Sequence, residues 1–212
     1  EGNRAFATKI WNASRFCEMN GIAPRGDFDP GAVTLPLSRW ILDAANSAVA
    51  EANASLEAFR FDDYAGACYR FTWNTFCDWF LEFAKPVLLG PDGAEKEEVK
   101  GVAQHVLGTV LRLLHPVMPF LTEELWHRLG YGAEGSLIRE TWPEAVSVEG
   151  AAEARAELDW VVGVVSEIRS IRSDFDIGYK IKGRLAAHMP PAEEARLRDR
   201  LRTLGRNAPG GD

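Results

Sequence analysis

Two prolines interrupt an apolar helical pattern in the segment Leu114-His115-Pro116-Val117-Met118-Pro119-Phe120-Leu121-Thr122-Glu123-Glu124-Leu125-Trp126. Proline has no backbone N–H and its ring collides with the preceding turn, so a helix that reaches Pro116 must break or kink there. Thr122, followed by Glu123 and Glu124, is suited to capping a new helix. The segment therefore predicts a rigid corner between two helices of an all-α domain.

Helical periodicity continues upstream of this corner. Apolar residues recur three or four positions apart, which is the spacing of a core-facing helical stripe. The stripes are Phe6, Ile10, Ala13 and Cys17; Tyr69, Trp73, Phe76, Phe80 and Phe83; and Val99, Val102, Val106, Val110 and Leu113. A further helix is predicted from Pro36 to about Phe59, and the aromatic-rich helix is predicted to begin at Asp62-Asp63 and to end at Lys85-Pro86. Because the loops are short, we expect an up-and-down antiparallel bundle of about five helices for residues 1–130.

The pattern changes after Pro143 and Gly150, and we predict a domain boundary there. Residues 1–147 are assigned to the bundle and residues 148–212 to a small helix-strand-helix appendage that is truncated. In this appendage we expect a helix over Ala151–Ser173, a strand over Lys182–Met189 and a charged helix over Ala192–Leu204. The chain opens on Glu1 inside a helical pattern, so we expect it to be a fragment of a longer protein.

The net charge of −7 argues against indiscriminate binding to nucleic acid. The charge is uneven, however, because acidic residues outnumber basic ones over residues 26–154 while basic residues prevail at both ends. One localised RNA site is compatible with this distribution. The sequence contains no run of 18 apolar residues, so it predicts no membrane span. The cysteines Cys17, Cys68 and Cys77 lie in or beside apolar stripes, which favours buried thiols in a reducing compartment over disulfides.

Signatures of catalysis are scarce in this sequence. It has no glycine-rich phosphate loop and no nucleophile elbow, and its histidines, at positions 105, 115, 127 and 188, show no ligand spacing. Asp78 and Glu82 lie one helical turn apart. This spacing suits a pair of catalytic carboxylates, and the alternative is that both belong to a solvated helical face. We therefore expect no catalytic residue, no metal ligand and no cofactor in this chain.

One helical face carries residues suited to binding RNA. Lys9, Asn12, Arg15 and Phe16 point away from the first apolar stripe and fall within about 120° of one another on a helix. A phenylalanine can stack on an unpaired base, an arginine can bind phosphate and an asparagine can recognise a base edge. The alternative is that Phe16 packs on another helix and that the charged groups are only solvated.

Three segments resemble one family of enzymes, the valyl-tRNA synthetases. Residues 3–16 (NRAFATKIWNASRF) are similar to the helix that follows the catalytic domain in that family. Residues 56–74 (LEAFRFDDYAGACYRFTWN) and 76–86 (FCDWFLEFAKP) are similar to its FCDWYLE and KP region, and the proline corner and Trp142-Pro143 also fit. The segment EIRSIRSD, residues 167–174, resembles the helix that follows the bundle. Isoleucyl and leucyl synthetases share the bundle and the corner, but the NxxRF and FCDW motifs favour the valine enzyme.

The resemblance implies a class I synthetase anticodon-binding domain whose partner is valine-specific tRNA. The catalytic signatures HIGH and KMSKS, the editing domain and the C-terminal coiled coil are absent from this sequence. ATP with Mg²⁺ is implied for the catalytic domain of the parent ligase, so we expect the fragment alone to be inactive. The family's anticodon contacts would fall on Lys9, Arg15 and Phe16, with Glu82 as a further candidate, and Asn12 is added from helical geometry.

We further expect a cytoplasmic monomer that does not bind a membrane. Two alternatives remain: the anticodon domain of an isoleucyl- or leucyl-type synthetase, or a helical scaffold that binds protein partners and no RNA. The scaffold requires an exposed apolar patch, whereas the RNA module requires a basic, aromatic groove beside the first and third helices.

Overall fold

The computed structural model describes residues 2–178, 192, 194 and 195, and within them the chain forms helices and no strand. This confirms the predicted all-α class. In chain order the elements are α1 (Gly2–Met19), η1 (Pro30–Ala32), α2 (Pro36–Glu57), α3 (Phe61–Arg70), η2 (Phe71–Phe80), α4 (Leu81–Leu88), α5 (Ala94–Leu114), α6 (Pro119–Arg128), η3 (Tyr131–Glu134), η4 (Leu137–Arg139) and α7 (Ala151–Asp174).

The chain divides into two compact units, Glu1–Ala154 and Arg155–Asp212. The predicted boundary between residues 147 and 148 stays a prediction. The strand expected over residues 182–189 lies outside the described residues, as does most of the helix expected over residues 192–204.

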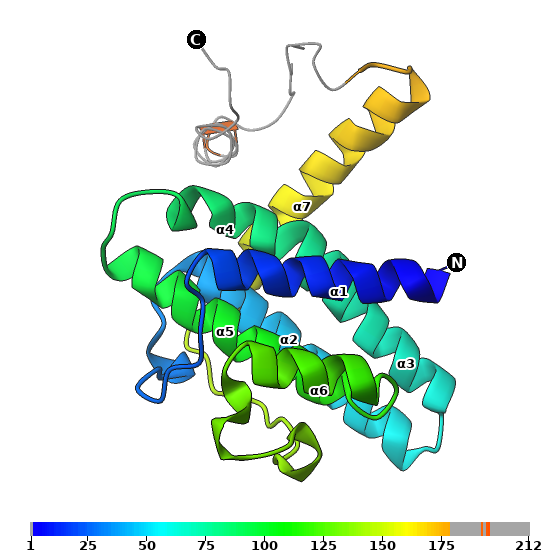
Figure 1. Cartoon of the computed structure of the whole chain (residues 1–212). Helices are drawn as coiled ribbons and strands as arrows, with labels where there is room; N and C mark the ends of the chain where they lie inside the picture. The colour runs from blue at the N-terminus through cyan, green and yellow to red at the C-terminus, as the bar shows by residue number, and fades with distance from the viewer. Residues whose placement is uncertain (1, 179–191, 193, 196–212) are drawn as a thin grey trace. The chain divides into compact units, whose positions relative to one another are not determined.

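Helix α5 is the centre of the first unit, since it contacts α1, α2, α3, α4 and α6 (Figure 1). The predicted stripe on α5 is buried throughout. The α1 stripe is buried as well, with Phe6, Ile10, Ala13 and Cys17 all less than 9% exposed. Helix α1 packs this stripe against η2, α5 and α6, so its opposite face is left on the outside of the bundle.

The aromatic-rich helix extends further than predicted. It starts at Phe61, and Asp63 pairs with the Arg60 side chain at 3.0 Å instead of capping the helix. Pro86 does not end it, because a proline in the last turn removes only one hydrogen bond, and the Leu89 N–H closes the turn on the Lys85 carbonyl at 2.9 Å. Glu82 and Lys85 therefore belong to one helical turn.

The middle of this helix, η2, is π-helical. The i→i+5 hydrogen bonds of a π-helix widen the turn and shift the side-chain phase relative to an α-helix. Phe76 and Phe80 are buried as predicted, but Tyr69 is 41% exposed and Trp73 is only half-buried. The prediction that all five aromatic residues belong to the core is therefore wrong for these two, and both lie near α1.

The proline corner forms where the sequence predicts it. Helix α5 ends at Leu114 and α6 begins at Pro119, and the Met118 N–H donates to the Leu114 carbonyl at 2.8 Å. Thr122 does not cap α6, contrary to the prediction. It is buried inside the helix, where its hydroxyl donates to the Met118 carbonyl at 2.9 Å and lies 2.8 Å from His115 Nδ1. The threonine thus holds the two sides of the corner together.

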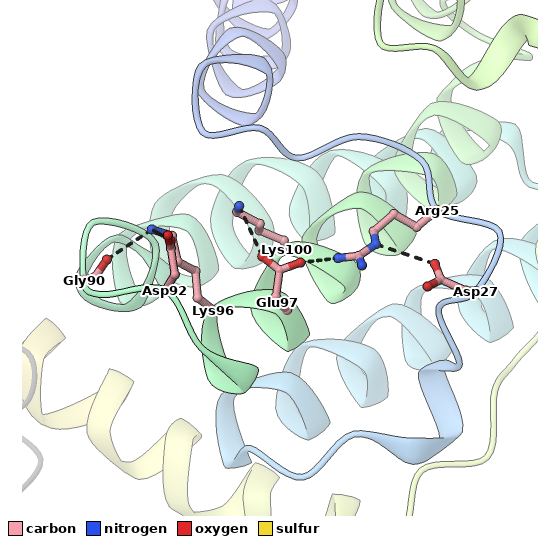
Figure 2. A network of polar contacts seen from close by, with 7 residues as sticks. All are labelled: Arg25, Asp27, Gly90, Asp92, Lys96, Glu97 and Lys100. Carbon is pink, nitrogen blue, oxygen red and sulfur yellow. Dashed lines mark hydrogen bonds and ion pairs between the residues drawn. The ribbon is translucent and has the colours of Figure 1, made fainter.

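Charged side chains connect the start of α5 to two loops (Figure 2). Arg25 pairs with Glu97 and lies 3.6 Å from Asp27, while Lys100 reaches Glu97 at 3.4 Å. Lys96 pairs with Asp92 at 2.9 Å and donates to the Gly90 carbonyl at 3.1 Å. These hydrogen bonds and ion pairs lower the pKa of Asp92, chiefly through Lys96, and of Glu97, chiefly through Arg25. The basic groups of this region are thus neutralised locally.

A carboxylate of α5 also secures the start of α2. Glu98 accepts hydrogen bonds from the Thr34 N–H at 3.0 Å, the Thr34 hydroxyl at 2.7 Å and the Leu35 N–H at 2.9 Å. Leu35 is the N-cap of α2 and provides no side-chain cap of its own. Burial alone would raise the pKa of Glu98, but the donated hydrogen bonds outweigh burial and hold this pKa below its usual range.

We predict that Glu98→Gln lowers the free energy of unfolding by about 1–3 kcal/mol at pH 7, because an amide leaves part of this donor set unsatisfied. The pKa of Glu98 is lower in the folded chain than in the unfolded chain. Its contribution is therefore complete above the unfolded value of about 4.3 and is lost as the pH falls through the folded value. Urea denaturation of wild type and variant at pH 7 and pH 3 measures this.

The matched control is Glu95→Gln, since Glu95 is exposed in the first turn of the same helix. It should change stability by less than about 0.5 kcal/mol. Equal stability of wild type and Glu98→Gln at pH 7 would contradict the role assigned to Glu98.

Candidate nucleic-acid interface

The outer face of α1 carries the residues predicted to bind RNA. Asn12 and Arg15 are exposed, and Phe16 is half-buried. Arg15 has no ion-pair partner among the described residues, and the same holds for Arg4, which is also exposed. Positions 4 and 15 differ by about three helical turns, so both guanidinium groups lie on one side of α1. This face is open, polar and positively charged.

Lys9 lies at the edge of the face, where α1 meets η2. Its Nζ pairs with the Asp78 carboxylate and lies 4.8 Å from the centroid of the Trp73 ring. Trp73 in turn stacks on Tyr69 with ring centroids 5.6 Å apart, and Tyr69 lies 4.7 Å from Phe6. Lys9 is thus joined to the bundle through an ion pair and an aromatic cluster, and it is not a freely solvated cation.

Phe16 meets α4 on the same side of α1. Lys85 Nζ lies 5.9 Å from the centroid of the Phe16 ring, within the range of a cation–π contact. Lys85 pairs with Glu82 at 2.5 Å, three residues earlier on the helix. The structure therefore brings Glu82 to the Phe16 region through Lys85, and the predicted site residues of both helices border one surface.

Asp78 and Glu82 do not form a pair of catalytic carboxylates, because each is bound to its own lysine. Two partners were not predicted from the sequence, Asp78 for Lys9 and Lys85 for Phe16. The spacing of Glu82 and Lys85 at i and i+3 is a local signal that predicts their pairing. Lys9 contacts Asp78 of η2, and Phe16 contacts Lys85 of α4. In each pair the two residues are 69 positions apart in the sequence, so no local pattern indicates these contacts.

The other flank of α1 is occupied by α6. Arg128 pairs with Glu18 at 3.1 Å and lies 5.1 Å above the Trp11 ring. This arginine is neutralised, so it adds little to the potential of the open face. The uncompensated positive charge of α1 is concentrated on Arg4 and Arg15.

The described residues include no group of three or more histidine, cysteine, aspartate or glutamate side chains that could hold a metal ion. His115 and His127 contact Thr122 and Glu123, respectively, and His188 lies outside the described residues. All three cysteines are buried and free, and burial raises the pKa of Cys68 to about 11. In the described part of the chain, no helix is long and apolar enough to cross a membrane.

A second surface feature is an apolar groove of about 710 Å³ between α3 and the proline corner. Its lining includes Phe6, Tyr69, Val117 and Phe120. Phe120 is 91% exposed and Val117 is 48% exposed. The unit thus has both surfaces that distinguish the two predicted alternatives, a basic face with an aromatic residue and an exposed apolar patch.

Comparison with known proteins bears on this choice. A family model described as the anticodon-binding domain of tRNA ligase matches residues 38–187. The chain is 58% identical over 173 residues to a valine–tRNA ligase of Granulibacter bethesdensis, with 81% of this chain and 19% of the relative covered. It is 49% identical over 197 residues to the Gluconobacter oxydans enzyme of the same name, with 93% and 20% covered, and 47% identical over 213 residues to that of Caulobacter vibrioides, with 97% and 24% covered.

The chain therefore spans about a fifth to a quarter of the length of these relatives. The family model covers most of the chain, from Ser38 in α2 through α7. The chain belongs to the family of anticodon-binding domains of tRNA ligases.

Proposed function

We propose that this chain is the module of a valine–tRNA ligase that holds the anticodon arm of valine tRNA. The observation that carries the proposal is the open face of α1, where Arg15, Asn12 and Phe16 lie together on a helix that packs against a bundle matched by an anticodon-binding family over residues 38–187. Valine as the amino acid is supported by the names of the relatives. In such a ligase ATP, Mg²⁺ and valine would bind outside this chain, and the enzyme would act as a cytoplasmic monomer.

Each residue of the face has a chemical role in this proposal. The Phe16 ring offers a stacking platform for an unpaired base. Arg15 has no carboxylate to release and supplies a guanidinium to phosphate or to a base. Asn12 presents an amide that both donates and accepts hydrogen bonds, as recognition of a base edge requires. Lys9 and Glu82 border the face through their partners Asp78 and Lys85.

The acidic body of the chain favours one location for the RNA. The net charge is −7, and the cations at the start of α5 are already paired with carboxylates. A polyanion is therefore repelled from most of the bundle and attracted where Arg4 and Arg15 are uncompensated. Binding on α1 would be local and sensitive to salt.

The apolar groove supports a second candidate, a surface for a protein partner. Phe120 and Val117 lie together there as exposed apolar side chains, and a contiguous apolar patch is typical of a site for a protein partner. The two functions are compatible because the groove and the α1 face involve different residues. The anticodon domain of an isoleucyl- or leucyl-type synthetase is the remaining alternative, and it differs only in which tRNA binds.

We predict that Phe16→Ala weakens binding of valine tRNA by about 1–3 kcal/mol, because it removes the stacking platform. Arg15→Ala should weaken binding and lower the slope of log affinity against log salt concentration by about one counterion. Fluorescence titration of each purified variant with the tRNA at two salt concentrations measures both effects. Helix content and thermal midpoint should stay near wild type, since neither residue belongs to the buried α1 stripe.

The control is Arg139→Ala, because Arg139 is an exposed arginine on η4 and not part of the α1 face. This variant should bind valine tRNA with the affinity of wild type. A tRNA with a replaced anticodon loop tests which part of the RNA is bound. If Phe16→Ala and Arg15→Ala are folded and bind as wild type does, the α1 face is not the site.

We also predict that the 212-residue chain neither exchanges pyrophosphate with ATP nor esterifies tRNA. The sequence contains neither of the two class I catalytic signatures, HIGH and KMSKS. The measurement is valine-dependent ATP–pyrophosphate exchange with the purified chain, compared with a full-length ligase. Valine-dependent exchange by the pure chain would refute this.

A further inference from the structure

A pocket of about 390 Å³ lies between the proline corner and residues 137–142, and we call it the corner pocket. A concave site with mostly apolar walls and a few convergent polar groups is the usual form of a small-molecule site, and its volume is in the usual range. No residue of the α1 face contributes to it. The lining includes Arg112, His115, Pro119, Ile138, Glu140 and Trp142.

Arg112, in the last turn of α5, has hydrogen-bond donors that the described residues do not use. Its side chain is 27% exposed, its Nε is buried, and no N–H of its guanidinium donates to another described residue. Arg128, by comparison, donates to Glu18 at 3.1 Å. Burial lowers the pKa of Arg112, and attraction to Glu140 offsets this only in part. Unused donors on a part-buried guanidinium are uncommon, because buried polar groups normally have partners.

Glu140 is the carboxylate that pairs with Arg112, but the pair is open. Its Oε2 lies 4.0 Å from Arg112 Nη2, which is close enough for attraction and too far for a hydrogen bond. Two groups at this separation can bind neighbouring atoms on the edge of one planar ring. The guanidinium then donates to an acceptor of the ligand, and the carboxylate accepts from a donor beside it.

Two further side chains of the lining are fixed by hydrogen bonds. Trp142 is 36% exposed, and its Nε1 donates to Asn53 Oδ1 at 2.7 Å, which sets the orientation of the indole. His115 Nδ1 lies 2.8 Å from the Thr122 hydroxyl, which itself donates to the Met118 carbonyl. The hydroxyl therefore accepts from Nδ1–H, and Nε2 of the neutral imidazole is left as an acceptor. The pocket thus combines an aromatic wall with one donor group and two acceptors.

We propose that the corner pocket binds the guanine base of a free nucleoside or mononucleotide. Guanine carries a carbonyl acceptor beside two N–H donors on one edge, so the carbonyl fits Arg112 and the two donors fit the Glu140 carboxylate. Trp142 supplies an aromatic surface for the base. The net charge of −7 and the carboxylate at the pocket disfavour a polyanion, so the ligand is a single nucleotide and not RNA.

Isothermal titration calorimetry of the purified 212-residue chain with GMP and AMP tests the selection of the base. GMP should bind on the order of tenfold more tightly, because adenine has an amino group in place of the carbonyl and lacks the paired donors. Guanosine should bind as GMP does, since the base and not the phosphate is recognised. Inosine lacks the exocyclic amino group and should bind about three- to tenfold more weakly than guanosine.

Variants of the two recognising residues test the assignment further. Glu140→Gln should remove most of the preference for GMP over AMP, because an amide offers one acceptor where the carboxylate offers two. Arg112→Lys keeps the charge but loses the planar fork, and it should weaken GMP binding by on the order of tenfold. Glu144→Gln and Arg139→Gln are the matched controls, since both residues are exposed, lie near Glu140 in the sequence and do not line the pocket.

Equal affinity of the wild-type chain for GMP and AMP, or no binding of GMP at millimolar concentration, would overturn the proposal. Neither result depends on whether a variant folds. Displacement of GMP by valine tRNA would overturn the assignment to a free nucleotide. This inference does not rest on the proposed function, because binding of valine tRNA to the α1 face is measured separately and either proposal can fail alone.

Discussion

Burial of α5 is the constraint on which the first unit depends. The helix contacts most of the other helices, and its residues from Val99 to Leu114 are almost all inaccessible to water. Close packing extends to its glycines: a Cβ at Gly101 would lie 2.2 Å from the Phe28 ring. A central helix of this kind leaves one face of each surrounding helix for solvent. The open face of α1 is a consequence of this arrangement.

The ends of α5 are specified as closely as its middle. At its start, Glu98 satisfies the backbone donors before α2, and Glu97 holds Arg25 of the loop between α1 and α2. At its end, the two prolines stop the helix, and Thr122 bridges to His115. The positions of α2 and α6 are thus fixed by short-range contacts with α5, and α1 packs into the space between η2, α5 and α6. A rigid frame of this type is suited to presenting side chains at fixed positions to a ligand.

The distribution of charge explains how an acidic domain can present a cationic face. Most basic side chains in the first unit have a carboxylate partner, and these pairs hold loops or neighbouring helices together. Arg15 is the exception within the proposed site. One side of α1 thus presents the unpaired cations Arg4 and Arg15 although the net charge of the chain is −7. The unit combines stability from paired charges with a small number of groups that are free to bind.

The sequence by itself determined the helical class, the α1 and α5 core stripes, the proline corner and the exposed side of α1. These are local properties, because they follow from periodicity of 3.6 residues per turn and from the missing N–H of proline. The predicted end of the aromatic-rich helix was wrong, because Pro86 falls in the final turn of α4. A proline there removes only one backbone hydrogen bond. Tyr69 and Trp73 were misassigned to the core because the π-helical turns of η2 change the phase of the stripe. Only the tertiary structure decided that Lys9 is bound by Asp78 and that Lys85 lies beside Phe16, since these contacts depend on how α1 packs against η2 and α4, and no local pattern encodes that packing.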